Sequence, residues 1–171
     1  MEKQEQTALE YLIRPARRED AVGISRVIIW ALRETNAKDY PEAVIARVEQ
    51  SFSPTAVLDL LERRLVFVAA KGDDIIGTAS LDGRVVRTVF IKPECQSRGI
   101  GRALMAQVER VAIEKGVTVL AVPSSVTAEP FYAKLGFNAV RDSYHGEERT
   151  IVMERRVPGV SQAPRARVRP P

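Results

Sequence analysis

A glycine-rich segment directly after an apolar run has the composition of an anion-binding loop. Residues 96–103 read QSRGIGRA and lie between an extended run at 85–91 and a helical pattern. Gly99 and Gly101 permit backbone dihedrals that side chains disfavour, so successive N–H groups can point toward the free N-terminus of the next helix. Those donors and the helix dipole favour a phosphate or pyrophosphate.

Two common phosphate-binding loops do not fit this segment. No Gly-Lys-Ser/Thr follows the glycines, and Leu104 stands where the dinucleotide-binding fingerprint has its third glycine. The sequence therefore indicates a different phosphate-bearing cofactor, or else a glycine-rich turn without a ligand.

A second segment predicts a short helix with two adjacent aromatic residues. Residues 117–122 read as a buried strand and 123–127 as a turn. Helix signals follow, with Thr127 as a candidate N-cap, Pro130 in the first turn and Gly136 as a C-cap.

Together the two segments resemble the GNAT superfamily of N-acyltransferases. The pattern Gln96-x-x-Gly99-x-Gly101 is similar to the acyl-CoA-binding signature of that superfamily, and the resemblance covers residues 12–155. A second landmark of the superfamily is similar to Ala128, Phe131, Tyr132, Gly136 and Phe137. The resemblance implies acetyl-CoA as cofactor and an α/β fold, in which a mixed, twisted sheet of about six to seven strands carries helices on both faces.

The order of elements agrees with that fold. Apolar periodicity and turn residues predict strands at 11–14, 65–70, 75–81, 84–91 and 117–122, and helices from 18, at 41–50, 55–63, 101–115 and 128–136. A closing hairpin is expected at 138–141 and 150–155, around an irregular loop at 142–149.

The resemblance also implies which residues bind the cofactor. The backbone of Val89, Phe90 and Ile91 would pair with the pantetheine arm and polarise the acyl carbonyl. The loop would hold the pyrophosphate, and its residues are Gln96, Ser97, Arg98, Gly99, Ile100, Gly101, Arg102 and Ala103. Ser125 stands where many relatives have an asparagine that reaches the pantetheine arm. Its hydroxyl would bond that arm through water or would only cap the turn, and both interpretations stay open.

Tyr132 is the predicted catalytic residue. A phenol near the thioester sulfur can protonate the departing thiolate, and the alternative is a tyrosine that only packs the helix. The general base is less defined, and Glu34, Asp39 and His145 are the candidates for it and for the acceptor site. Each of the three is alternatively a solvated surface residue.

Length, composition and charge limit the remaining possibilities. The 171 residues, 45% hydrophobic and 28% charged, suit one domain, expected at 1–156. Residues 157–171 form a basic, Pro- and Arg-containing tail that we expect to be disordered, and this tail carries much of the net charge of +4. We therefore expect no nucleic-acid partner. With no signal, no membrane span and a single cysteine, a cytoplasmic protein without a metal site is expected.

The sequence thus predicts an N-acetyltransferase. It would move an acetyl group from acetyl-CoA to a primary amine by direct attack in a ternary complex, with a small molecule as acceptor. Two alternatives stay open, a non-catalytic acyl-CoA-sensing module and an acetyltransferase of protein lysines or N-termini. A homodimer is possible.

Overall fold

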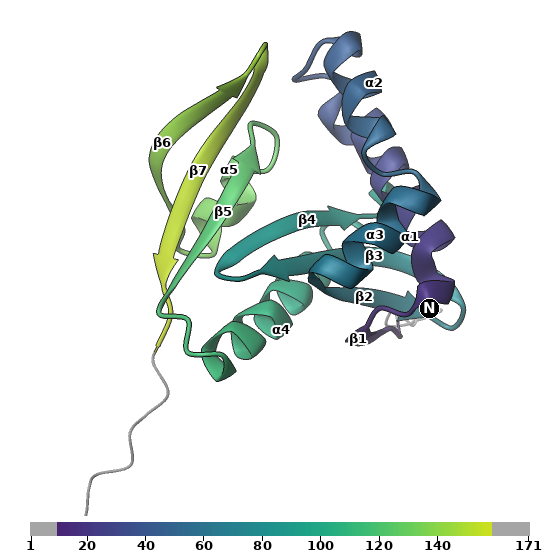
Figure 1. Ribbon diagram of the computed structural model, residues 1–171, viewed down its shortest axis with the longest axis horizontal. Coiled ribbons are helices and arrows are strands. Elements are labelled where there is room, and N and C mark those ends of the chain that lie inside the picture. The colour runs from purple at the N-terminus through teal and green to yellow at the C-terminus, as the bar shows by residue number, and fades with distance from the viewer. Residues whose placement is uncertain (1–9, 159–171) are drawn as a thin grey trace, which may run out of the picture.

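The computed structural model describes residues 10–158 as one mixed sheet with helices on both faces (Figure 1). The strands are β1 (Leu12–Pro15), β2 (Leu65–Lys71), β3 (Asp74–Asp82), β4 (Val85–Ile91), β5 (Val119–Ser125), β6 (Asn138–His145) and β7 (Glu148–Arg156). The helices are α1 (Ala21–Ala31), α2 (Glu42–Gln50), α3 (Pro54–Arg63), α4 (Ile100–Glu114) and α5 (Glu129–Lys134).

The sheet has seven strands in the order β1-β2-β3-β4-β5-β7-β6. All neighbouring pairs are antiparallel except β4 and β5, which are parallel because α4 crosses between them. The predicted fold class, a mixed α/β sheet covered by helices, is confirmed.

Alternation along the strands creates a core on each face. On β2, Phe67 and Ala69 belong to the cluster that packs against α4, whereas Val68 and Ala70 belong to the cluster under α1 and α3. Successive strand side chains point to opposite faces, so a continuous apolar run buries both sides of the sheet. The two layers hold the strands around the centre of the sheet in fixed positions.

Several predicted boundaries were wrong. The strand expected to stop before residue 123 continues to Ser125, and the loop expected at 142–149 is instead the β6–β7 hairpin, which turns at Gly146. All eight residues of β6 are exposed, so this strand lacks the apolar alternation that would identify it in the sequence. The helix expected at 55–63 begins at Pro54, and Ser53 caps it, because its hydroxyl accepts the Ala56 N–H at 3.2 Å.

The domain extends slightly farther than predicted. Val157 was assigned to the tail, but it is buried in the core and its N–H donates to the Thr118 carbonyl at 2.9 Å. The rest of the predicted tail, from residue 159, lies outside the described residues.

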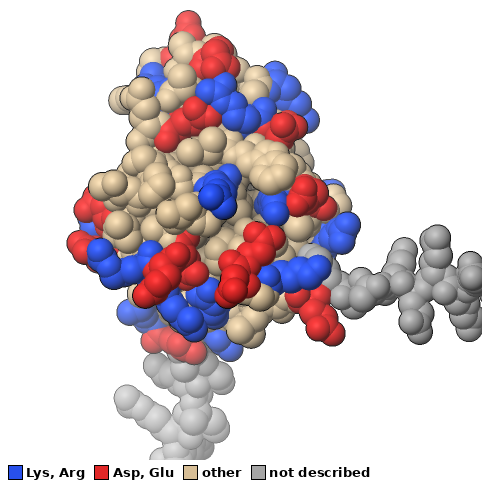
Figure 2. All heavy atoms as spheres, turned by 90° about the vertical axis from the view of Figure 1, so that its right-hand side faces the viewer, with Lys and Arg blue, Asp and Glu red and all other residues tan. Residues whose placement is uncertain are grey.

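The surface on the side of α1 and α2 carries both signs of charge. Figure 2 shows Lys and Arg side chains interspersed with Asp and Glu around an uncharged area. Within residues 10–158, every helix is too short or too polar to span a bilayer.

A part-buried ion pair joins β1 to the start of α1. Arg14 donates to both carboxylate oxygens of Asp20, at 2.7 and 2.9 Å, and the Arg17 N–H donates to Asp20 as well. The hydrogen bonds from Arg14 lower the pKa of Asp20, against the opposing effect of burial.

We expect Asp20→Asn to lower the free energy of unfolding by about 1–3 kcal/mol, because it leaves the Arg14 guanidinium without its charged partner. The pKa of Asp20 is lower in the folded state, so the contribution is present above the unfolded pKa of about 4 and is lost as the pH falls through the folded value. Urea denaturation at pH 7 and pH 3 measures both effects. Asp59→Asn is the control, because Asp59 pairs with Arg63 on the exposed surface of α3 and should change little. Equal effects of the two substitutions would contradict the prediction.

Candidate active site

The strands β4 and β5 touch at one end and then separate. Their register contains a single pair, Val85 with Ala121, and the Ala121 N–H donates to the Arg84 carbonyl at 3.0 Å. Beyond this point β4 pairs with β3 and β5 pairs with β7, but not with each other. The facing edges of two central strands are therefore left open to a ligand.

A β-bulge in β4 lies at this opening. Ser80 pairs with Arg87 and Thr78 with Phe90, so Thr88 and Val89 together oppose one residue of β3. Thr88 has a φ of +56°, which is unusual for a β-branched residue. The bulge turns the backbone of 88–89 away from regular pairing, at the place where the resemblance predicts contact with the acyl group.

The glycine-rich loop forms a free helix N-terminus at the same opening. Ser97 and Gly99 both have positive φ, and α4 begins at Ile100 without a side-chain cap. The first helical bond runs from the Ala103 N–H to the Gly99 carbonyl, at 3.0 Å. The amides of residues 100–102 precede that bond and can donate to an anion, whereas the amide of Ala103 is already used.

A cavity of about 650 Å³ connects the loop with the gap between the strands. Of the predicted cofactor residues, Arg98 and Ala103 are the two that do not line it. Those that do are Val89, Phe90, Ile91, Gln96, Ser97, Gly99, Ile100, Gly101, Arg102 and Ser125. The cavity continues to α5, where Phe131 and Tyr132 line it.

The two glycines of the loop have different structural roles. Gly99 needs its conformational freedom, because its φ is +82°. Gly101 instead leaves room for a neighbour, since a Cβ there would lie 3.1 Å from the Phe131 ring. Gly101 therefore permits close packing of α4 on α5, in addition to any contact with a phosphate.

Tyr132 is almost completely buried, yet its side chain lines the cavity. Phe131 and Phe137 pack edge-to-face against its ring, at centroid distances of 5.1 and 5.8 Å. No hydrogen bond to its hydroxyl is found within residues 10–158. Burial raises the pKa of Tyr132 well above its ordinary value, so the phenol keeps its proton at neutral pH.

Gln96 and Ser125 have partners within the protein. The Gln96 amide donates to the Thr35 hydroxyl at 3.2 Å and to the Ile91 carbonyl at 3.4 Å, so it ties the loop to β4. The Ser125 hydroxyl accepts the Ala128 N–H at 3.1 Å, which is the turn-capping role. This hydroxyl also lines the cavity and can still donate.

A second cavity, of about 330 Å³, lies on the other side of the opening. Residues shared by both cavities are Asn36, Thr88, Phe90, Pro123 and Ser125. Asn36 ends a π-helical turn that continues α1, and its side chain is nearly buried. Two ligands, one in each cavity, would therefore meet at these shared residues.

The three predicted acceptor residues line neither cavity. Glu34 is exposed, Asp39 accepts a 2.7 Å hydrogen bond from the Thr127 hydroxyl, and His145 is exposed at the end of β6. The three predicted residues are titratable, but the residues of this segment that line the first cavity are the uncharged Thr35 and Asn36. Both lie between Glu34 and Asp39 in the sequence.

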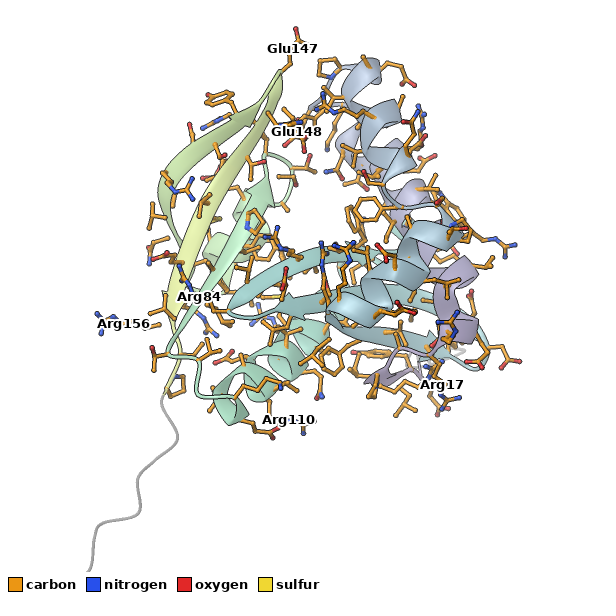
Figure 3. All side chains as sticks on the ribbon, in the orientation of Figure 1. Arg17, Arg84, Arg110, Glu147, Glu148 and Arg156 are labelled. Carbon is orange, nitrogen blue, oxygen red and sulfur yellow. The ribbon has the colours of Figure 1, made fainter. Side chains whose placement is uncertain are left out.

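Contacts from α2 and from Tyr40, which precedes it, reach the β5–β7 region beside the second cavity. Figure 3 shows Glu148 at the start of β7, on the side that faces α2, and Arg47 pairs with it at 2.9 Å. The Tyr40 hydroxyl accepts the Val126 N–H at 2.7 Å and donates to the Arg149 carbonyl at 3.0 Å. Tyr40 and Glu148 also line the cavity, and local sequence patterns gave no signal for either.

The fold and the two adjoining cavities are those of an acetyltransferase of the GNAT type. Comparisons with known proteins agree with this assignment. The family described as "Acetyltransferase (GNAT) domain" matches residues 23–153. The chain therefore belongs to this family.

Similar solved structures share the fold. A GCN5-related N-acetyltransferase of Rhodopseudomonas palustris has a TM-score of 0.80 and 24% identity, over 85% of this chain and 95% of that one. The PaiA N-acetyltransferase of Thermoplasma acidophilum, solved in complex with coenzyme A, has a TM-score of 0.74 and 21% identity, over 86% and 99%.

Similarity to a curated protein is more limited in extent. Serotonin N-acetyltransferase 2, chloroplastic, of Oryza sativa subsp. japonica is 32% identical over 84 residues. This match covers 49% of the chain described here and 39% of the rice protein.

Proposed function

We propose that the protein transfers an acetyl group from acetyl-CoA to the primary amine of a small molecule, by direct attack in a ternary complex. The observation that carries the proposal is that Tyr132 lines the same cavity as a free helix N-terminus. Its hydroxyl is protonated and makes no hydrogen bond within residues 10–158. PaiA and YncA, two proteins of the same fold, were solved with coenzyme A and acetyl-CoA, respectively.

The residues of the first cavity have separate tasks in this proposal. Acetyl-CoA supplies the acetyl group as a thioester. The amides of residues 100–102 and the helix dipole bind its pyrophosphate, and the open edge of β4 pairs with its pantetheine arm. Tyr132 donates its proton to the sulfur as the C–S bond breaks and the C–N bond forms.

The second cavity holds the amine in the same proposal. An amine placed beside Asn36 and Ser125 is close to both cavities, so no covalent enzyme intermediate is needed. Glu148 is the one carboxylate among the described residues that line this cavity, and we assign it the amine proton, directly or through water. The cavity volume of about 330 Å³ favours a small acceptor, and the rice relative is named for serotonin, a small amine.

Binding of coenzyme A should depend on the backbone of Gly99. We expect Gly99→Ala to weaken binding roughly tenfold or more, because a side chain disfavours the left-handed dihedral that aims the loop amides. Calorimetric titration with coenzyme A measures the affinity.

Gly116→Ala is a matched control. Gly116 also has a φ of +82° and open space around it, but it follows the other end of α4 and does not line the cavity. Both substitutions should lower stability similarly, and only the first should weaken binding. If both variants bound coenzyme A like the parent protein, the assignment of the loop would be wrong.

Turnover should depend on the Tyr132 hydroxyl. We expect Tyr132→Phe to lower kcat about 10²-fold while the affinity for acetyl-CoA barely changes, because the leaving thiolate loses its proton donor. Thiol release from acetyl-CoA with a panel of amines measures kcat, and Tyr144→Phe on exposed β6 is the control. Unchanged kcat in Tyr132→Phe, measured where chemistry limits the rate, would assign Tyr132 to packing alone. Absence of turnover with every amine would support the sensing alternative.

A further inference from the structure

The second cavity combines an apolar wall with two arginines. Its apolar lining comes from the π-helical turn after α1, from α2, from the α2–α3 connection and from β4, and consists of Leu32, Val44, Ile45, Val48, Phe52 and Phe90. Arg64 and Arg87 line the same cavity. A ligand that fills this space must therefore satisfy both an apolar surface and a positive charge.

Arg64 has no anionic partner in the described part of the chain. Its Nη1 donates to the Thr88 hydroxyl at 3.1 Å, and no carboxylate of residues 10–158 lies within ion-pair distance. Burial lowers the pKa of the Arg64 guanidinium, and the positive charge of Arg87 lowers it further. The group remains charged at neutral pH, but it is partly desolvated beside a like charge.

Arg87 is incompletely paired as well. Its Nε is buried and finds no hydrogen-bond partner within residues 10–158, although a carboxylate oxygen of Asp82 lies 3.4 Å away. Asp82 thus provides one carboxylate beside two guanidinium groups, while the Glu148 carboxylate that also lines the cavity pairs with Arg47. An anionic ligand would relieve the repulsion between the arginines and would accept the hydrogen bonds that they do not make inside the protein.

The position of Arg64 limits how far the anion can be from the reacting amine. Arg64 is hydrogen-bonded to Thr88, and Thr88 lines both cavities at the bulge of β4. An anion bound to Arg64 is therefore adjacent to the junction at which the amine must meet the acetyl group. The amine and the anionic group must be separated by few atoms in the acceptor.

We propose that the acceptor is an apolar α-amino acid, whose carboxylate binds Arg64 and Arg87 and whose side chain packs against the apolar wall formed by Leu32, α2 and Phe90. The inference rests on the proposed function and specifies the substrate class of the same site.

A matched pair of acceptors tests the carboxylate directly. Phenylalanine and phenethylamine differ only in that group, and leucine and 3-methylbutylamine form a second pair. We expect kcat/KM to be at least tenfold higher for the amino acid in at least one pair. Equal values, or a preference for the decarboxylated amine in both pairs, would overturn the inference and leave the proposed acetyl transfer intact.

Substitution of the two arginines tests whether they cause the preference for the amino acid over its decarboxylated amine. Arg64→Gln and Arg87→Gln should each lower kcat/KM for the amino acid about 10- to 100-fold, the range for a lost charged hydrogen bond. The kcat/KM for the decarboxylated amine should stay the same or rise. Arg63→Gln is the control, because Arg63 pairs with Asp59 on the exposed side of α3. A substitution that only disturbed the β4 bulge would lower kcat/KM equally for both acceptors. If the ratio of kcat/KM for the amino acid to kcat/KM for its amine stayed unchanged in both variants, the arginine site would be refuted.

Binding of the reaction products provides a readout that does not need turnover. In the presence of coenzyme A, N-acetylphenylalanine should bind at least tenfold more tightly than N-acetylphenethylamine, and Arg64→Gln should abolish the difference. If no amine is acetylated but this preference is found, the proposed function fails and the carboxylate site stands. If neither product binds, or both bind equally, the carboxylate site is refuted.

Discussion

The separation of β4 from β5 is the constraint on which the rest of the site depends. A parallel pair in the middle of a sheet normally continues its hydrogen bonds along its length, but here the pairing ends after Val85 and Ala121. Residues of α4 and α5 line the opening, and Phe131 of α5 lies against Gly101 of α4. Unpaired backbone groups are costly when buried, so an opening of this kind is suited to a ligand that supplies hydrogen bonds.

The two cavities are coupled because they share the walls of this opening. Asn36, Thr88 and Ser125 come from three separate segments and line both cavities. The β4 bulge keeps Thr88 in a disfavoured backbone conformation, and the hydrogen bond from Arg64 holds its side chain. Thr88 therefore links Arg64 in the second cavity to the β4 edge of the first cavity. Tyr40 and Arg47 contact the β5–β7 region beside the second cavity.

Local sequence patterns predicted the fold, and most of the residues predicted to bind the cofactor line the first cavity. The glycine loop and the Phe131-Tyr132 helix are continuous segments whose turn residues and spacing define them without tertiary information. The second cavity was not predicted, because Arg64, Arg87 and Glu148 lie far apart in the sequence and come together only in the folded protein. Asn36 was not predicted because it is not titratable. The π-helical turn Leu32–Asn36 buries Leu32 and Asn36, and no local sequence pattern indicated this turn. The cytoplasmic location, the homodimer and the disordered tail stay predictions.

A structure of the protein with acetyl-CoA would show whether the opening between β4 and β5 is the cofactor site. We expect the pantetheine arm to lie between β4 and β5, with the pyrophosphate at the amides of residues 100–102. The thioester sulfur should lie within about 3.5–4 Å of the Tyr132 hydroxyl, near the hydrogen-bonding limit for sulfur. An acetyl-CoA molecule bound outside this opening, or bound there with its sulfur turned away from Tyr132 toward solvent, would contradict the account.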